Sequence, residues 1–237
     1  MSRHSTPEQT AENLSPRRTQ PEPTAETADR ASSRSRRAFL LGGAAAAGAL
    51  VALPAGEAQA RNGISVADQF RGIQRHENAH VAFLVQALGD SARPRPTFRN
   101  LTQPNRGVFF AVSFALENTG VGAYLGAASV IFNPAYLAAA GSIALIEGRH
   151  AGYLDNLLGS VTTTNVFGED QDFERALTIT EVTRQARRFI ADLNGGPPLT
   201  FGTTPSAKND IAILNFALAL EYLEAEFYNI NVPRFFG

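Results

Sequence analysis

The chain has 237 residues, of which 21 are lysine or arginine and 22 are aspartate or glutamate, so its formal net charge is −1. Without an excess of basic residues, it lacks the electrostatic signature of a nucleic-acid-binding protein. It contains no cysteine, which excludes disulfide bonds, thiolate metal ligands and cysteine nucleophiles. Its stability must therefore come from core packing, and any metal site must use oxygen and nitrogen ligands.

The first 60 residues predict segments that lie outside the folded domain. Residues 1–33 are rich in Ser, Thr, Pro, Glu and Arg and have no apolar period, which is typical of a disordered extension. Residues 34–60 resemble a twin-arginine signal peptide, because Arg36 and Arg37 precede an apolar run (40–53) and an A-x-A cleavage site. That run is shorter than the roughly 20 residues that span a bilayer. We expect cleavage, export to the periplasm or the extracellular space, and no stable membrane insertion afterwards; the alternatives are an uncleaved N-terminal anchor and a chance Ala-rich stretch.

Residues 61–237 form the predicted folded domain, in which apolar residues recur at helical spacing. Four long helices are expected, over 64–88, 106–128, 134–158 and 209–230, together with an extra amphipathic helix between 171 and 194. No segment is expected to form a strand. Long helices with short connections predict an all-α protein, an antiparallel four-helix bundle with one extra amphipathic helix.

Two of these helices carry the same pattern, E-x-x-H-x-x-x-L-x-x-x-L-G, which starts at Glu77 and again at Glu147. Residues three or four positions apart share one helix face, so each Glu and His falls in the middle of an apolar stripe. The two stripes are Phe70, Ile73, Glu77, His80, Leu84 and Leu88, and Tyr136, Ala140, Ile143, Glu147, His150, Leu154 and Leu158. Charged groups in such positions face the core and not the solvent.

The other two long helices carry a simpler version of this arrangement. Glu117 and Glu221 each lie within an apolar stripe, and each is followed seven residues later by a tyrosine, Tyr124 or Tyr228. The chain therefore contains two halves of one repeat. Four carboxylates and two imidazoles are expected to meet in one interior.

Unpaired buried charges cost several kcal/mol each, even after relaxation. Two divalent cations would neutralise four carboxylates, and neutral histidines would add nitrogen ligands. One Glu from each of two helices, plus a Glu-x-x-His motif from each of the other two, is the ligand set of a carboxylate-bridged di-metal bundle. Mixed oxygen and nitrogen ligands favour iron or manganese. A single Glu-x-x-His motif would be a weak signal, but two copies with matching leucines are a much stronger one.

These residues resemble the ferritin-like superfamily, and within it the exported ferritin-like domain family that includes desiccation-related proteins. The stretches HENAHVAFLVQALG, FALENTGVGAYLGAA and NFALALEYLEAEFY carry the resemblance, which covers most of 64–159 and 209–230. It implies two divalent metal ions, iron or manganese. The ligands that it implies are Glu77, His80, Glu117, Glu147, His150 and Glu221.

The order of the helices departs from that family, because the helix that usually comes first in it comes last here. The chain therefore looks circularly permuted. Its last helix either closes its own bundle or docks into a second copy, which would give a homodimer by exchange of the C-terminal helix. This departure puts Glu221 in more doubt than the other ligands, and Glu224, one turn further on, is its rival.

Two further side chains remain open as neighbours of the site. His76 precedes Glu77, and we expect it on the helix surface or against a ligand. Tyr124 and Tyr228 are interpreted as core residues with hydrogen-bonded hydroxyls, with a redox role as the alternative.

The resemblance implies an exported protein that protects against oxidative or desiccation stress through O2 or peroxide chemistry at the di-metal centre. The alternative is a non-enzymatic structural or stress-protective envelope protein, whose metal site is structural or lost. An iron store is a third and weaker option.

Overall fold

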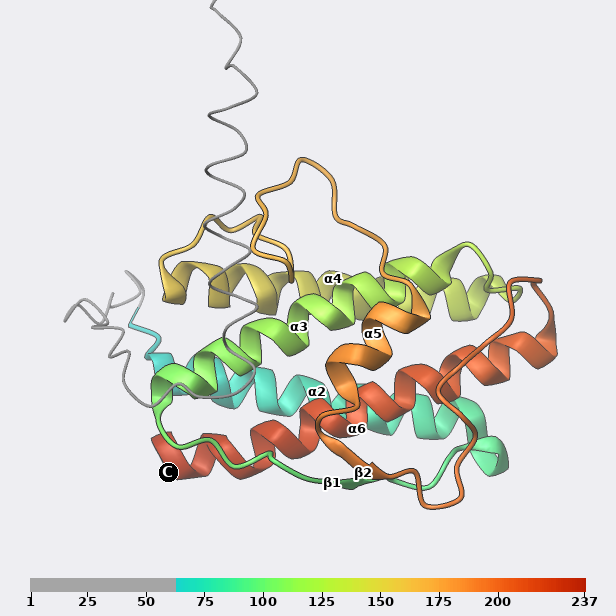
Figure 1. The fold of residues 1–237 in the computed structure, drawn as a ribbon, viewed down its shortest axis with the longest axis horizontal. Coiled ribbons are helices and arrows are strands. Elements are labelled where there is room, and N and C mark those ends of the chain that lie inside the picture. Colours follow the sequence, from blue (N-terminus) through green and yellow to red (C-terminus); the bar gives the residue numbers. More distant parts are fainter. Residues whose placement is uncertain (1–62) are drawn as a thin grey trace, which may run out of the picture.

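The structure, a computed structural model, describes residues 63–237, so the predicted extension (1–33) and signal peptide (34–60) lie outside the described residues. Four long helices form a bundle (Figure 1): α2 (Val66–Leu88), α3 (Arg106–Ala128), α4 (Pro134–Leu158) and α6 (Ala207–Phe236). The pairs α2–α6 and α3–α4 pack side by side and run antiparallel, whereas α2 and α3 run in the same direction. The segment between α2 and α3 therefore crosses from one end of the bundle to the other. The prediction of an all-α helical bundle is confirmed.

Local sequence signals set the helix boundaries. The Ser65 side chain accepts a hydrogen bond from the Asp68 N–H, and the Asp68 carboxylate accepts in return, which forms a capping box at the start of α2. Asn133 caps α4, whose first residue is Pro134. Gly159 ends α4 with a positive φ of 75°, a conformation that glycine adopts without strain.

The predicted buried stripe of α2 is confirmed residue for residue. The buried residues of this helix are Phe70, Ile73, Glu77, His80, Leu84 and Leu88. On α4 the stripe is confirmed in its centre, but Tyr136 and Leu158 are only half-buried. Ala151 and Asp155, which the stripe did not include, are buried there as well.

A polar layer divides the hydrophobic core into two halves. One half contains Phe70, Ile73 and Phe109, and the other contains Leu84 and Leu88. Because Glu77 and His80 lie between these residues on α2, the acidic groups are enclosed by apolar packing on both sides. Helix α3 is long and apolar enough to cross a membrane, but 67% of that stretch is buried inside the bundle, as a core helix requires.

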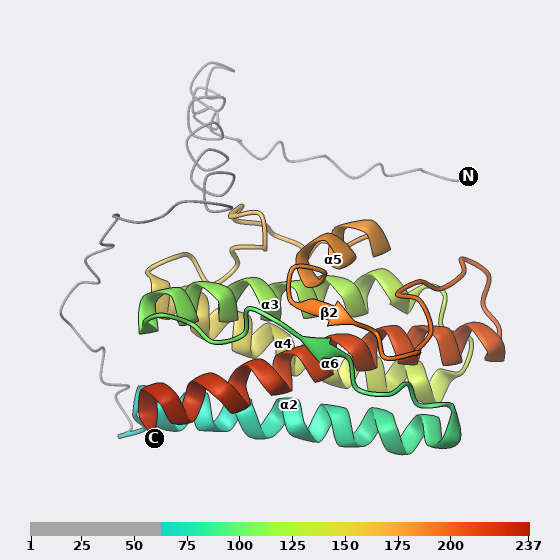
Figure 2. The ribbon, with the colours of Figure 1, turned by 60° about the horizontal axis from the view of Figure 1, so that its bottom comes forward.

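The predicted extra amphipathic helix is present, but the expected span of 171–194 is wrong because the helix is much shorter. Only α5 (Ile179–Ala186) is helical there, and Ile190–Asp192 forms a strand, β2, that pairs antiparallel with β1 (Thr97–Phe98). The expectation of no strand is wrong as well. The physical reason is a contact with α3: the Leu177 N–H donates to the Gly122 carbonyl at 2.9 Å, which holds the chain before α5 out of a helix. Figure 2 shows α5 on the outside of α3.

The last helix is longer than predicted. It begins at Ala207, where Ser206 accepts a hydrogen bond from the Asn209 N–H, and it continues through Pro233 to Phe236. It packs against α2 of the same chain along its length. The fourth side of the bundle is therefore supplied by the end of the same polypeptide.

Candidate metal centre

The bundle brings the six predicted ligand residues together in the polar layer. Glu77 and His80 lie on α2, Glu117 on α3, Glu147 and His150 on α4, and Glu221 on α6. Glu77, Glu117 and Glu147 are completely buried, and none of the six is more than 9% exposed. Every long helix thus contributes at least one carboxylate to a site that water barely reaches.

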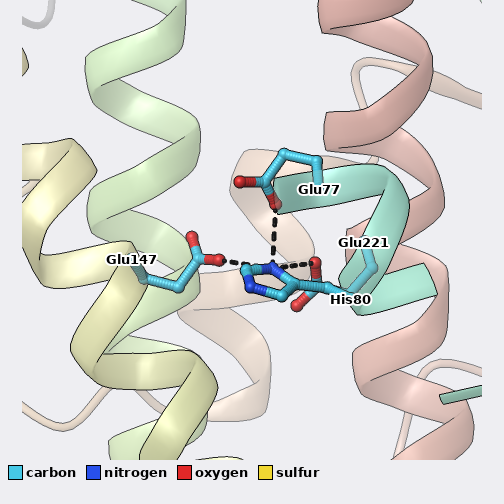
Figure 3. Close-up of side chains that lie close together, drawn as sticks. All are labelled: Glu77, His80, Glu147 and Glu221. Atoms are coloured by element: carbon cyan, nitrogen blue, oxygen red, sulfur yellow. Dashed lines mark hydrogen bonds and ion pairs between the residues drawn. The ribbon is translucent and has the colours of Figure 1, made fainter. Parts of the chain in front are cut away.

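One half of the cluster surrounds the His80 ring (Figure 3). Its Nδ1 atom lies 3.2 Å from a carboxylate oxygen of Glu77, of Glu147 and of Glu221. A single ring N–H donates one good hydrogen bond and not three. Four potential ligand atoms that all lie within 4.8 Å of one another could hold one metal ion, and this candidate metal-binding group consists of Glu77, His80, Glu147 and Glu221.

The other half repeats this arrangement around His150. Its Nδ1 lies 3.1 Å from Glu77 Oε1 and 3.0 Å from Glu117 Oε2. The second metal-binding group consists of Glu77, Glu117, Glu147 and His150. Glu77 and Glu147 therefore belong to both groups, whereas each histidine and each remaining glutamate belongs to one.

The two shared glutamates have buried oxygens that no protein group satisfies. Glu77 Oε1 and both side-chain oxygens of Glu147 have no hydrogen-bond partner, although His150 and His80 lie within ion-pair distance. Leaving such atoms buried and unpaired is strongly unfavourable. Adjacent ligands of an octahedral ion lie about 3.0 Å apart when each is about 2.1 Å from the metal. The separations of 3.0–3.2 Å around the two histidines match that value, so the residues fit two divalent cations.

Without a metal, protons must take over the role of balancing the carboxylates. Burial opposes protonation of His80, but hydrogen bonds to Glu221 and Glu77 outweigh it and raise its pKa to about 10. Burial likewise opposes protonation of His150, yet Glu117 and Glu77 raise its pKa to about 10. These two imidazolium groups in turn outweigh the burial of Glu77 and lower its pKa to about 2.

Glu221 and Glu147, in contrast, have raised pKa values and hold their own protons more tightly than a free carboxyl group. Burial raises the pKa of Glu221 to about 7, although His80 partly offsets this effect. Burial, followed by repulsion from Glu77 and Glu224, raises the pKa of Glu147 well above its usual range. The metal-free cluster therefore holds protons that a metal ion would have to displace.

Each tyrosine at the seventh position reaches the glutamate of the opposite helix. The Tyr124 hydroxyl on α3 donates to Glu221 Oε1 at 2.5 Å, and the Tyr228 hydroxyl on α6 donates to Glu117 Oε1. Both tyrosines are buried. The prediction of hydrogen-bonded core tyrosines is confirmed, and the bonds orient the two glutamates that are not shared between the groups.

Three further residues, Glu224, His76 and Gly120, lie next to the cluster without belonging to either metal-binding group. Glu224 is buried at 3% exposure beside the site but belongs to neither metal-binding group, whereas Glu221 belongs to the group around His80. His76 is exposed on α2, and its Nδ1 lies 2.9 Å from His150 Nε2. The role of Gly120 was missed: a Cβ atom there would lie 2.8 Å from Glu147 Oε2. The signal was present in the repeat, where Gly120 takes the position that corresponds to Glu224.

Comparison with known proteins places the fold and the cluster in a family. No curated protein and no solved structure matches the chain. The sequence model of the ferritin-like domain matches residues 34–160 and 209–235, which include all six residues of the cluster. The match covers more than half of the chain, and the chain therefore belongs to the ferritin-like domain family.

Proposed function

We propose that this protein is an exported ferritin-like protein that binds two divalent cations, iron or manganese, and uses them in O2 or peroxide chemistry. The observation that carries the proposal is the pair of shared glutamates, Glu77 and Glu147, of whose four buried carboxylate oxygens three lack a hydrogen-bond partner in the protein. Bound iron or manganese would supply the redox chemistry that no side chain of this cluster provides.

The residues around the site have distinct roles in this proposal. Glu77 and Glu147 belong to both groups, and together with Glu117 and Glu221 they would balance the charge of two divalent ions. His80 and His150 each supply one nitrogen ligand to one position. Glu117 and Glu221 are the unshared carboxylates, held in place by the tyrosine hydroxyls, and the apolar packing on both sides limits the access of water.

We further propose that the protein acts in the periplasm or the extracellular space, in oxidative or desiccation stress. The twin-arginine motif at Arg36 and Arg37 supports export, and the resemblance to exported, desiccation-related ferritin-like proteins supports the stress role. The position of α6 at the end of the chain supports a permuted helix order. Because α6 packs on α2 of its own chain, exchange of this helix between two copies is not needed to complete the site.

A second candidate is a stress-protective envelope protein in which the metal serves stability alone. The near-complete burial of all six residues favours it, because a site that water barely reaches also restricts the entry of an oxidant. Both candidate functions require the cluster to bind cations. They differ in whether the loaded protein consumes O2 or peroxide.

The first experiment is elemental analysis of the protein after export, compared with a Glu147→Ala/His150→Ala variant. We expect about two equivalents of iron or manganese per chain in the first and none in the second. Glu226→Gln is the matched control, because Glu226 lies on α6 but pairs with Arg95 away from the cluster. Full metal content and full stability in the double variant would refute the di-metal proposal. Consumption of peroxide or O2 by the loaded protein, and not by the double variant, separates the enzyme from the structural candidate.

A further inference from the structure

The outer face of the His150 ring contacts a second histidine. His76 Nδ1 and His150 Nε2 are 2.9 Å apart, the two ring planes differ by 3°, and the ring centroids are 5.2 Å apart. With the nitrogens this close, so large a centroid separation requires the rings to lie edge to edge in nearly one plane. This is the geometry of an in-plane N–H···N hydrogen bond and not of face-to-face stacking.

The surroundings of His150 decide the direction of this bond. Its Nδ1 faces Glu77 and Glu117, at 3.1 and 3.0 Å, and is therefore the ring nitrogen directed at the other members of the metal-binding group. A neutral imidazole that offers Nδ1 to a metal carries its hydrogen on Nε2. His150 Nε2 therefore donates to His76 Nδ1, and this acceptor holds His150 in the tautomer and orientation that a metal ligand needs.

The equivalent histidine on the other side of the cluster lacks such a partner. Ile146 precedes Glu147 as His76 precedes Glu77, so the repeat offers an aliphatic side chain where His80 would need an acceptor. Within residues 63–237, His80 Nε2 makes no hydrogen bond. In most other respects the two halves of the cluster match, since the unshared glutamate of each half accepts a hydrogen bond from a tyrosine hydroxyl.

We propose that His76 is a positioning residue that makes the two metal positions unequal, so that the position containing His150 fills before the position containing His80. The inference rests on the proposed di-metal site. Acceptors outside the ligand set change metal affinity by about 10- to 100-fold when they are removed, and we expect a difference of that size between the two positions.

The test is an equilibrium titration of the metal-free full-length protein with Co²⁺, followed by visible absorption and by dialysis. We expect two equivalents in two phases separated by about 10- to 100-fold in affinity. His76→Leu should weaken only the tighter phase by that factor, so that the two phases merge. His76→Asn should retain two phases, because its amide oxygen offers an acceptor close to the position of Nδ1. His76 is exposed, so these variants are expected to fold, which circular dichroism verifies.

A second variant tests the inference by adding an acceptor at the position that lacks one. Ile146→His should give His80 the missing acceptor and strengthen the weaker phase, while leaving the tighter phase unchanged. The tighter phase should be absent from His150→Ala, which assigns it to that position. A single class of two equivalent ions in the unaltered protein, or a His76→Leu titration identical to it, would overturn the inference. Failure to bind Co²⁺, Fe²⁺ or Mn²⁺ at all would instead refute the di-metal proposal on which it rests.

Discussion

Tyr124 on α3 donates a hydrogen bond of 2.5 Å to Glu221 on α6, and Tyr228 on α6 returns the same bond to Glu117 on α3. Each helix thus orients the carboxylate of the other. Two helices that are far apart in the sequence are joined through two bonds that cross the polar layer. The repeat of a glutamate and a tyrosine seven residues later has its physical explanation in this reciprocal pair.

Removing either hydroxyl should destabilise the protein. Tyr124→Phe and Tyr228→Phe each leave a buried carboxylate oxygen without its donor, and we expect a loss of about 1–3 kcal/mol in the free energy of unfolding. Urea denaturation measures it. Tyr153→Phe is the control, because the Tyr153 hydroxyl is buried without a hydrogen-bond partner, and its removal should change stability little. Equal losses in all three variants would show that the bonds to the glutamates contribute nothing specific.

The absence of a side chain at Gly120 leaves room for the carboxylate of Glu147. In Gly120→Ala the new methyl group would lie 2.8 Å from Glu147 Oε2, and the shared carboxylate would have to move. We expect metal affinity at both positions to fall by about tenfold or more, measured by Co²⁺ titration. Gly148→Ala, next to Glu147, has no atom within 4 Å of its new methyl group. It should bind metal normally and gain up to about 1 kcal/mol in stability from helix propensity.

Glu221 and Glu224 should behave differently although both are buried on α6. Glu221→Gln removes a carboxylate from the metal-binding group around His80, so we expect one equivalent of metal in place of two. Glu224→Gln leaves both groups intact and should retain two equivalents. Elemental analysis of the two variants, purified side by side, distinguishes these outcomes; a loss confined to Glu224→Gln would reverse the assignment.

The metal-free protein should become less stable as the pH rises. Folding raises the pKa of Glu221 from 4.5 to about 7, and the pKa of His80 and of His150 from 6.5 to about 10. Between pH 5 and 9 the folded chain therefore holds more protons than the unfolded chain. The free energy of unfolding then decreases with pH, by up to about 1 kcal/mol per pH unit for each titrating group. Thermal unfolding in the presence of a chelator measures this trend.

Metal binding should show the opposite dependence on pH. Each ion must displace protons from the histidines and the acids that it binds, so affinity should rise as the pH rises from 5 to 8. Stabilisation by bound metal follows affinity. The difference in Tm between loaded and metal-free protein should therefore widen with pH. A constant difference would show that binding releases no protons and that the histidines are not ligands.

Much of the centre could be predicted because its residues follow helical spacing. Glu77 and His80 interrupt an apolar stripe at positions that a helix places on one face, and the structure buries all six members of that stripe. The bundle then brings together residues whose positions on their helices are equivalent. Local periodicity was sufficient for this part of the molecule.

The segment after α4 could not be predicted in the same way. Its sequence has an amphipathic period, but a contact far away in the chain decides its conformation. Gly122 and Gly126 leave room on α3 for the Leu177 backbone and side chain, which lie where their Cβ atoms would be. This contact and the pairing of β2 with β1 outweigh helix propensity at both ends of α5. The contact between His76 and His150 also escaped prediction, because it depends on how two helices face each other.

Because α6 follows the other helices in the sequence, the site is incomplete until α6 has been synthesised. Synthesis reaches α2, α3 and α4 before α6. Glu221 and Tyr228 lie on α6 and are therefore made after the other members of the cluster. A chain that ends early would lack the closing side and one carboxylate of the cluster. A full complement of the proposed ions would therefore report that α6 had been made and had packed against α2.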